Sequence, residues 1–494
     1  MAGFAGAYDS ICGRAVNAAI IRIFGGGFQV TLAPDLLDKL SRIVGANKLL
    51  MDAEAHVQYG RDWTRVETPS PAAVALPGSI EQVQALVQLA NAEGLAIVPS
   101  GGRTGLSGGA VAARGELVVA LDNLNQIGAF NSIDRSVVCG AGVITEQLQQ
   151  FAEDQGLHYP VDFASSGSSQ IGGNVATNAG GIKVIRYGMT RDWVVGLKVV
   201  TGTGELLELN AGLIKNNAGY DLRHLMIGSE GTLGIIVEVT IRLCRAPTDL
   251  AVMVLGVPDM PSIMSTLAEF RQQMELTAFE FFSEPALQKV VAHQDLQRPF
   301  DEPCAYYALL EFEQTSGSEM DQAMALFEHC LEQGWVLDGV VSQSVAQARN
   351  LWRLREDISE TIARWAPYKN DLSVVVSKVP EFLTAVEALV NAAYPDFEII
   401  WYGHIGDGNV HLNILKPESL SIADFAEQCG EVSKGVFEIV REHRGSVSAE
   451  HGVGVLKKPY LPYSRSPLEI ELMRAIKRSF DPNGVLNPGK IFDL

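Results

Sequence analysis

The sequence has few cysteines and no paired cysteine motif. Its six cysteines are scattered at long intervals along 494 residues, and no CxxC pair occurs. Such spacing is typical of reduced core thiols and argues against a disulfide scaffold or a zinc knuckle. The sequence also lacks an uninterrupted apolar run of about 18 residues, so we expect no transmembrane helix.

Basic residues are a minority of the charged residues. The chain has 38 Lys and Arg against 58 Asp and Glu, which gives a formal net charge of −20. A nucleic-acid surface needs a basic stripe, so nucleic acid is not expected as a partner. An anionic ligand must therefore be bound by locally placed Arg or Lys. The hydrophobic content of 47% excludes general disorder, and the length corresponds to two to four domains.

Motifs for nicotinamide dinucleotides and for P-loop nucleotides are absent. Pairs such as Gly202-Thr203-Gly204 lack the third glycine of GxGxxG, and no GxxxxGK[ST] occurs. The sequence instead has three glycine loops: PSGGRTGLSGG at 99–109, SSGSSQIGGNVATNAGGIKVIRYG at 165–188 and GSEGTLG at 228–234. Glycines let backbone N–H groups approach a phosphate without a Cβ in the way. Three such loops suit a large, extended ligand such as FAD.

Helix and strand signals surround these loops. Ser79 is expected to cap a helix that ends at Gly94, and a short strand is expected over 95–98. Beyond residue 246 the pattern predicts strands over 252–257 and 305–312 and helices over 263–276 and 318–333. The glycine-poor stretch that begins near Arg245 suggests a domain boundary.

The glycine loops resemble those of the vanillyl-alcohol-oxidase type of flavoproteins. The resemblance spans roughly residues 49–245 and implies an FAD that these loops bind. Members that bind FAD covalently usually carry His in the first loop; this chain has Arg103 there, which implies non-covalent FAD. The resemblance assigns cofactor binding to Pro99, Ser100, Gly101, Gly102, Arg103, Thr104, Gly105, Ser107, Gly108, Ser168, Ile171, Gly172, Gly173, Asn174, Thr177, Asn178, Gly180, Gly181, Glu230, Gly231, Gly234, Ile235 and Asn487.

Histidines are concentrated near the C-terminus, where four of the nine lie within 48 residues. The segment FEIIWYGHI-GDGN-VHLNIL predicts a hairpin with a four-residue loop at 406–409. Ile405 then pairs with Val410, and His404 lies directly opposite His411, close enough for both imidazoles to bind one metal. Asn413 follows on the same face, and Glu450-His451 supplies a carboxylate and another imidazole. A His/His/Glu set with an open position is typical of catalytic zinc.

These later motifs resemble the FAD-linked D-2-hydroxyacid dehydrogenases. GHIGDGNVHLNI, SAEHGVG and FDPNGVLNPGKIF carry the resemblance. It implies that His404, His411 and Glu450 bind a divalent metal, with zinc the first choice, and that His451 is the base. It also implies that the segment around Asn487 returns to the FAD-binding domain.

The substrate residues are expected on a helix that runs from Leu351 to Trp365. Arg355 and Ser359 are four residues apart and share a helix face. Arg355 can bind one carboxylate, and Lys369 can bind a second. LREDISETI and YKNDLS are similar to D-2-hydroxyglutarate dehydrogenases, which implies substrate binding by Arg355, Ser359, Lys369, Asn413 and His451. Ser359 stands where Thr is common, and D-lactate enzymes usually lack the Lys.

The sequence thus predicts an α+β protein with a two-part FAD-binding domain and an α/β substrate domain built on an antiparallel sheet. We expect a leader and helical segment at 1–48 (1–27 being a flexible leader), FAD binding at 49–245, substrate and metal binding at 246–455, and a returning segment at 456–494. The predicted reaction oxidises a D-2-hydroxy acid, D-2-hydroxyglutarate first and D-malate next, with hydride transfer to flavin N5. Alternatives are a D-lactate dehydrogenase, an FAD subunit of a glycolate- or lactate-oxidising complex, and a flavin-binding partner without turnover. The expected acceptor is an electron-transfer flavoprotein or a quinone, the expected location is the cytoplasm, and a homodimer is plausible.

Overall fold

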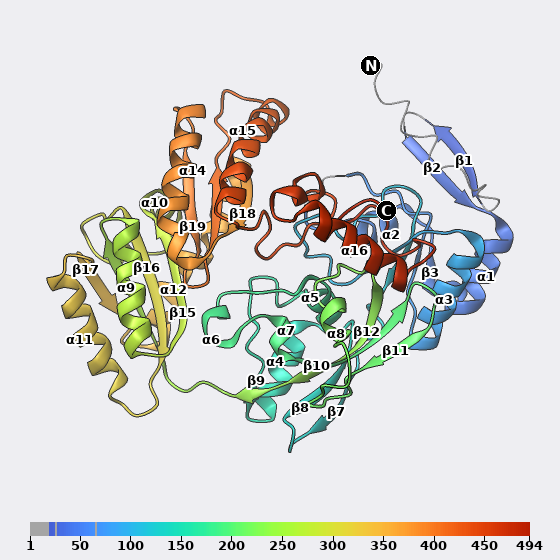
Figure 1. Ribbon diagram of the computed structural model, residues 1–494, viewed down its shortest axis with the longest axis horizontal. Helices are drawn as coiled ribbons and strands as arrows, with labels where there is room; N and C mark the ends of the chain where they lie inside the picture. The colour runs from blue at the N-terminus through green and yellow to red at the C-terminus, as the bar shows by residue number, and fades with distance from the viewer. Residues whose placement is uncertain (1–18, 25–26, 65–66) are drawn as a thin grey trace.

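The computed structural model describes residues 19–24, 27–64 and 67–494, which form two parts that lie side by side (Figure 1). The blue, cyan and green part precedes residue 246, and the yellow and orange part follows it. The predicted leader lies mainly outside the described residues. Its described end is β1 (Ala19–Phe24), which pairs antiparallel with β2 (Gly27–Leu32).

Two sheets form the N-terminal part. In the order β3-β4-β6-β5, strands β4, β6 and β5 are parallel and β3 is antiparallel to β4. The second sheet is antiparallel, in the order β11-β10-β12-β8-β7, and β9 pairs with β13. The strands are β3 (Leu49–Leu50), β4 (Ala73–Ala75), β5 (Ile97–Ser100), β6 (Leu117–Ala120), β7 (Ile127–Asn131), β8 (Ser136–Gly140), β9 (Leu157–His158), β10 (Val194–Thr201), β11 (Leu206–Leu209), β12 (Gly234–Arg242) and β13 (Cys244–Arg245).

Helices surround these sheets, and the signals around the first glycine loop are confirmed. They are α1 (Pro34–Val44), α2 (Ala53–Tyr59), α3 (Ile80–Glu93), α4 (Thr145–Asp154), α5 (Ile171–Thr177), α6 (Val184–Tyr187), α7 (Thr190–Trp193) and α8 (Arg223–Met226). Ser79 caps α3 by accepting from the Gln82 N–H, and Gly94 ends it in the left-handed conformation. Strand β5 begins two residues later than expected, because the Leu95 N–H still bonds to the Ala90 carbonyl of the helix.

One antiparallel sheet forms the C-terminal part. Among the described residues its order is β17-β14-β16-β15-β19-β20-β18. The strands are β14 (Leu250–Val257), β15 (Leu276–Ser283), β16 (Tyr306–Glu313), β17 (Asp338–Val341), β18 (Tyr368–Ser373), β19 (Ile399–His404) and β20 (Asn409–Ile414). The helices are α9 (Met260–Gln273), α10 (Glu284–His293), α11 (Glu319–Glu332), α12 (Val345–Glu356), α13 (Ile358–Ile362), α14 (Val379–Ala393), α15 (Ile422–Glu442) and α16 (Pro467–Phe480).

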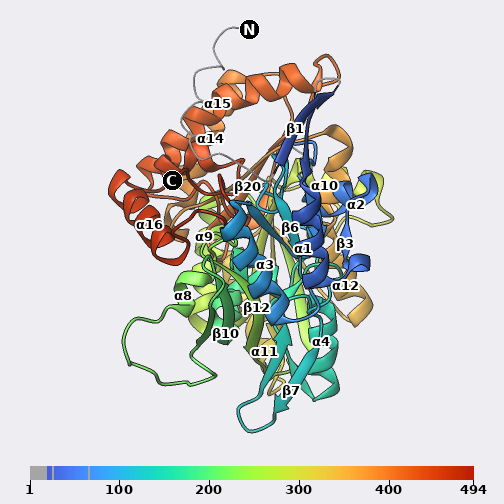
Figure 2. The ribbon, with the colours of Figure 1, turned by 90° about the vertical axis from the view of Figure 1, so that its right-hand side faces the viewer.

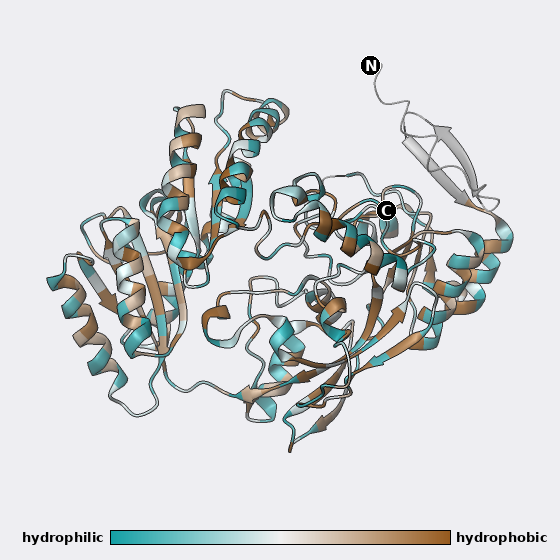
Figure 3. Ribbon diagram, viewed as in Figure 1, coloured by the Kyte–Doolittle hydropathy of each residue, from teal (hydrophilic) through white to brown (hydrophobic). Residues whose placement is uncertain are grey.

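Both faces of this sheet are covered. Apolar residues of α9, α11, α14 and α15 form one core with the sheet, and those of α10, α12 and α13 form another. Helices α14 and α15 pack against each other, as Figure 2 shows. In Figure 3 these helices carry both brown and teal residues, as expected for helices with one buried side. Helix α9 begins three residues before the predicted start, because Asp259 caps it through the Ser262 N–H.

The chain crosses back to the N-terminal part at its end. Figure 1 shows the red α16 on the side of the blue and green elements. After it, the Ile97 N–H donates to the Val485 carbonyl and the Asn487 N–H to the Ile97 carbonyl, each at 2.7 Å. The end of the chain therefore extends the parallel sheet beside β5.

A partly buried ion pair joins the two parts. Lys183, just before α6, pairs with Glu311 of β16. Trp352 of α12 donates Nε1 to the same carboxylate at 2.8 Å, and the Lys183 ammonium lies 4.6 Å from the centroid of the Trp352 ring. This contact fixes α12 relative to the second glycine loop. Within the described residues, no helix is both long and apolar enough to cross a membrane.

Candidate active site

The hairpin of β19 and β20 carries the two histidines, with a register that differs from the predicted one. His404 lies opposite Asn409, and His411 lies opposite Tyr402. The pairing of Ile405 with Val410 and of His404 with His411 was therefore wrong. The loop ends at Gly408, whose φ of +88° turns the chain one residue earlier than expected, and a Cβ there would lie 2.1 Å from the Val374 carbonyl oxygen. Because the pairing shifts by two residues, both rings stay on one face, with centroids 5.4 Å apart.

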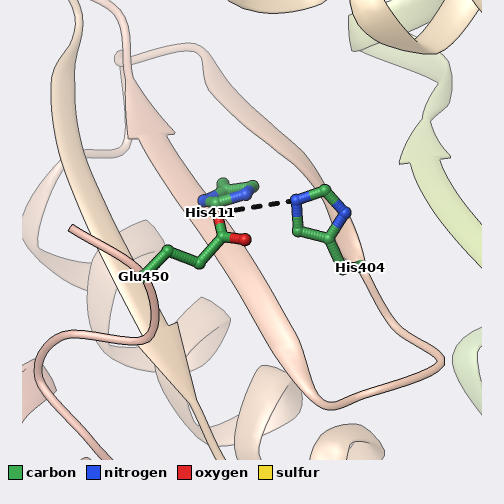
Figure 4. A group of neighbouring side chains, drawn as sticks. All are labelled: His404, His411 and Glu450. Carbon is green, nitrogen blue, oxygen red and sulfur yellow. Dashed lines mark ion pairs between the residues drawn. The ribbon is translucent and has the colours of Figure 1, made fainter. Parts of the chain in front are cut away.

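Glu450 completes a group of three candidate metal ligands (Figure 4). One ligand atom each from His404, His411 and Glu450 lies within 4.8 Å of the others. The dashed line in Figure 4 marks the 3.7 Å contact between His404 Nε2 and Glu450 Oε2. The other carboxylate oxygen accepts the Gly181 N–H at 3.0 Å, so the second glycine loop contacts this group directly.

The electrostatics of the group favour a cation. Burial alone would raise the pKa of Glu450, but the His404 ring lowers it to about 2. Burial likewise opposes the charged form of His404, yet Glu280 and Glu450 raise its pKa well above the usual value. Burial and the charge of His404 lower the pKa of His411 to about 3. The neutral His411 and the ionised Glu450 are thus in the protonation states that metal binding requires, whereas His404 must release its proton to bind a metal.

Two buried carboxylates that the sequence analysis missed hold these residues. Glu280 of β15 accepts from His404 Nδ1 at 2.9 Å and pairs with Arg355 at 2.8 Å. It is the one charged residue in the otherwise apolar or hydroxyl-bearing strand LTAFEFFS, and that isolation was the available signal. A carboxylate on the second nitrogen of a metal-binding His orients its ring.

Asp371 of β18 is the second missed carboxylate. Its Oδ2 accepts the backbone N–H groups of Glu450 and His451 at 3.1 Å each, and it lies 3.4 Å from His451 Nδ1. Lys457 donates to the same oxygen at 3.2 Å. Burial would raise the pKa of Asp371, but these cationic neighbours hold it well below its usual value. Asp371 follows Lys369 by two residues on one strand face, and that period was the missed signal.

The predicted substrate residues gather beside the metal-binding group. Lys369 lies opposite Asn413 in the pairing of β18 with β20, and its Nζ donates to Ser359 Oγ at 3.0 Å. The Arg355 guanidinium lies 4.7 Å from the centroid of the Tyr402 ring. Arg355 Nε and Asn413 Oδ1 are buried without a hydrogen-bond partner. A bound 2-hydroxy acid offers an acceptor to Arg355 Nε through its carboxylate and a donor to Asn413 Oδ1 through its hydroxyl.

The helix that carries Arg355 is interrupted, contrary to the continuous helix predicted from 351 to 365. Helix α12 ends at Glu356 and α13 begins at Ile358, with a 3-10 turn over Ala363–Trp365. Asp357 stands at the break and accepts from Arg353 Nε at 3.0 Å. Arg355 and Ser359 nevertheless both face the sheet. Arg355 lies over the Tyr402 ring, and Ser359 is within hydrogen-bond reach of Lys369.

The glycine loops enclose a cavity. Sixteen predicted cofactor residues line it: Pro99, Ser100, Gly101, Gly102, Arg103, Thr104, Gly105, Ser107, Gly172, Gly173, Asn174, Thr177, Glu230, Gly231, Gly234 and Ile235. The sequence analysis missed the lining residues Asp62, Gly109, Ala110, Leu121, Gln170, Ala176 and Ile236. Gln170 Oε1 is buried there without a hydrogen-bond partner, so the cavity fits a polar ligand with donor groups.

Seven predicted cofactor residues do not line the cavity: Gly108, Ser168, Ile171, Asn178, Gly180, Gly181 and Asn487. Asn487 instead ties the glycine loops together, because its side-chain amide donates to the carbonyls of Gly109 at 2.9 Å and Glu230 at 2.8 Å. Gly180 leaves room for Glu450, since a Cβ there would lie 2.8 Å from Glu450 Oε1. Their contribution to cofactor binding stays a prediction.

Comparison with known proteins identifies the families that the chain matches. Residues 71–210 match the FAD binding domain family, and residues 246–491 match the C-terminal domain of FAD linked oxidases. The chain is 62% identical over 459 residues to the D-2-hydroxyglutarate dehydrogenase of Stutzerimonas stutzeri (strain A1501), which covers 93% of this chain and 99% of that protein. The mitochondrial D-2-hydroxyglutarate dehydrogenase of Arabidopsis thaliana is 36% identical, over 91% of this chain and 80% of that protein.

The chain belongs to the D-2-hydroxyglutarate dehydrogenase family. It is an FAD-dependent oxidoreductase, as the sequence predicted. p-Cresol methylhydroxylase has the same fold, with a TM-score of 0.72 at 15% identity over 93% of this chain and 96% of that one. Alkyldihydroxyacetonephosphate synthase gives a TM-score of 0.71 at 20% identity, over 95% of this chain and 88% of that one. The predicted α+β fold with a two-part FAD-binding domain is thus confirmed.

Arg103 occupies the place where covalent flavoproteins of this fold usually have His. It forms two hydrogen bonds to the Asp122 carboxylate, at 3.0 and 3.2 Å, and lies 4.7 Å from the centroid of the Tyr59 ring. A guanidinium held in this way does not form a bond to a flavin ring. We therefore keep non-covalent FAD as our proposal for this member of the family.

Gly102 tests the assignment of the cavity to FAD. A Cβ at this position would lie 2.3 Å from the Ser168 carbonyl oxygen, so Gly102→Ala forces the first two glycine loops apart. We expect at least a tenfold loss of FAD affinity, which corresponds to about 1.4 kcal/mol. The measurement is flavin absorbance per protein during titration of the deflavinated enzyme. Gly430→Ala in α15, where a Cβ meets nothing within 4 Å, should bind FAD like the unchanged protein; equal affinity for both variants would contradict the assignment.

Proposed function

We propose that the chain oxidises D-2-hydroxyglutarate to the 2-oxo acid with FAD and a divalent metal. The carrying observation is the pair of cations beside the histidine group. Arg355 is buried next to Tyr402. Lys369 lies opposite Asn413 in the pairing of β18 with β20, and Asn413 lies two residues from His411 along β20. Two strand residues span roughly 7 Å, which suits the second carboxylate of a five-carbon diacid whose hydroxyl lies at the metal-binding group.

Each side chain has a separate role in the proposed reaction. Arg355 binds the carboxylate next to the reacting carbon, and Lys369 binds the distal one. His451, held through its backbone and ring by Asp371, takes the hydroxyl proton on its free nitrogen. When bound, FAD supplies the hydride acceptor and the metal supplies a Lewis acid at the hydroxyl oxygen. His404, His411 and Glu450 would hold that metal, and zinc suits this donor set.

The proposal extends to a second substrate and to an electron acceptor. D-malate is one methylene shorter than D-2-hydroxyglutarate and has the same two carboxylates, so we include it. The acceptor that we propose is an electron-transfer flavoprotein or a quinone, since the chain has no nicotinamide fingerprint. The cytoplasmic location and the homodimer also stay predictions.

Lys369→Met tests the substrate assignment. We expect KM for D-2-hydroxyglutarate to rise about 10- to 100-fold, because a hydrogen bond to a charged group contributes about 1.5–3 kcal/mol. Activity with D-lactate, which has no second carboxylate, should change little. The control is Lys378→Met, which removes an exposed lysine that pairs only with Glu381 of its own helix turn among the described residues. If D-lactate reduces the unchanged enzyme and D-2-hydroxyglutarate does not, the substrate proposal is wrong and the D-lactate alternative stands.

A further inference from the structure

The segment from Glu450 to Gly454 is held from both parts of the molecule. On the substrate side, Asp371 accepts the N–H groups of Glu450 and His451. On the cofactor side, Glu230 accepts two further N–H groups: Val453 N–H donates to Oε1 and Gly454 N–H to Oε2, each at 2.7 Å. We call residues 450–454 the linking segment, because these bonds connect β18 to the third glycine loop.

The backbone carbonyl and the side-chain carboxylate of Glu230 contact different parts of the chain. The residue lines the FAD cavity, and its carbonyl accepts the Asn487 amide. Its side chain is 8% exposed with both oxygens directed at the linking segment. The fit is close, since a Cβ on Gly452 would lie 2.9 Å from Glu230 Oε1 and one on Gly454 would lie 2.1 Å from the Ser107 carbonyl oxygen.

We infer that Glu230 is a positioning residue that sets the place of His451 and Glu450 relative to the FAD cavity, through the N–H groups of Val453 and Gly454. Nothing in the glycine-loop pattern separates this role from direct cofactor binding. The inference rests on the proposed function, in which His451 is the base and Glu450 a metal ligand. Both hydrogen bonds of the Glu230 carboxylate go to the backbone of the linking segment, at Val453 and Gly454, and not to a substrate residue or a candidate metal ligand.

This role predicts a change in the rate of flavin reduction that differs from the change in binding. Arg355 and Lys369, which bind the two carboxylates in the proposed function, lie on α12 and β18, outside the linking segment, so most of the substrate affinity should survive the loss of Glu230. The relative placement of the base and the flavin does depend on it, and a displacement of about 1 Å can slow a reaction about 100-fold. Loss of the Glu230 bonds should therefore lower the rate of flavin reduction more than it weakens FAD or substrate binding.

The experiment compares Glu230→Gln with Glu116→Gln. Glutamine keeps the shape but replaces one acceptor oxygen with an amino group that faces a backbone N–H. Glu116 is a matched control, because it is a buried carboxylate that accepts a backbone N–H at 2.7 Å, from Arg114, within its own loop. In anaerobic stopped flow with D-2-hydroxyglutarate, Glu230→Gln should reduce flavin about 10- to 100-fold more slowly than Glu116→Gln, with a much smaller change in substrate Kd and with unchanged FAD content.

Hydrogen exchange supplies a readout that does not need turnover. In Glu230→Gln, the amides of Glu450 and His451 should lose protection together with those of Val453 and Gly454, because the linking segment moves as a unit. Unchanged protection of Glu450 and His451 would overturn the inference. So would a normal reduction rate combined with weakened FAD binding, which would assign Glu230 to the cofactor.

Two further outcomes are kept apart. If D-2-hydroxyglutarate fails to reduce the unchanged enzyme, the proposed function is wrong, and the exchange experiment alone decides the role of Glu230. If Glu230→Gln does not fold, Glu230→Asp replaces it. The aspartate keeps both carboxylate oxygens, but its side chain is one methylene shorter. The Glu230→Asp variant should therefore show partial loss of amide protection in the linking segment and an intermediate rate of flavin reduction. Full protection of these amides would again contradict the inference.

Discussion

Replacing His451 with alanine is expected to slow flavin reduction by D-2-hydroxyglutarate about 100- to 10,000-fold, the range that a general base contributes. His451 lies 3.4 Å from Asp371 through Nδ1, which leaves the other ring nitrogen for the substrate proton. FAD content should not change, because His451 does not line the FAD cavity. Anaerobic stopped-flow absorbance at saturating substrate measures the rate, and the flavin spectrum measures the cofactor.

The control and the pH profile sharpen this test. His329→Ala, in α11 far from the hairpin in Figure 1, should keep the full rate. Burial lowers the pKa of His451, although Asp371 opposes the shift. The base is therefore unprotonated at neutral pH, and the rate should fall only as the pH drops below the ordinary histidine pKa of about 6.5. A His451→Ala enzyme with the full rate and the same acid limb would show that another group takes the proton.

Removing His404 is expected to cost both the metal and the activity. His404→Ala deletes one of three candidate ligands and leaves Glu280 and Glu450 without the ring between them. Replacement of groups around a metal site typically costs about 10- to 100-fold in affinity or activity, and loss of a direct ligand should exceed that. Elemental analysis of the purified protein and flavin reduction rates give the two readouts.

Chelation offers the matched experiment on the unchanged protein. Dialysis against a chelator should abolish flavin reduction while FAD stays bound, and added zinc should restore the rate. Manganese and cobalt, which accept the same nitrogen and oxygen ligands, then establish metal preference. A His404→Ala enzyme that retains one metal per chain and full activity would refute the assignment of the ligands.

Sequence patterns were sufficient where a local signal dictated the structure. Ser79 and Gly94 mark the two ends of α3, and the alternation of side chains in β20 places His411 and Asn413 on one face. The predicted hairpin register was wrong by two residues, because the loop ends at Gly408 rather than at Asn409. The close approach of Gly408 to the Val374 carbonyl oxygen is a tertiary contact that the local sequence does not show. The two histidines survived that error since a shift of two preserves the face.

The site residues that escaped prediction are those with partners far away in sequence. Glu280 meets His404 across 124 residues, and Asp371 meets His451 across 80. No spacing rule connects such residues; the folded sheets bring them together. A buried carboxylate shows only that some partner exists, because an unpaired one would be strongly destabilising, and the partner itself is set by tertiary packing.

The ion pair between Lys183 and Glu311 constrains how the enzyme moves during turnover. Parting the two halves would break this largely buried pair and separate the Lys183 ammonium from the Trp352 ring. Substrate entry and product exit should then proceed without separation of the two parts. The turnover rate should therefore be insensitive to solvent viscosity, unlike that of enzymes whose domains open and close in each cycle.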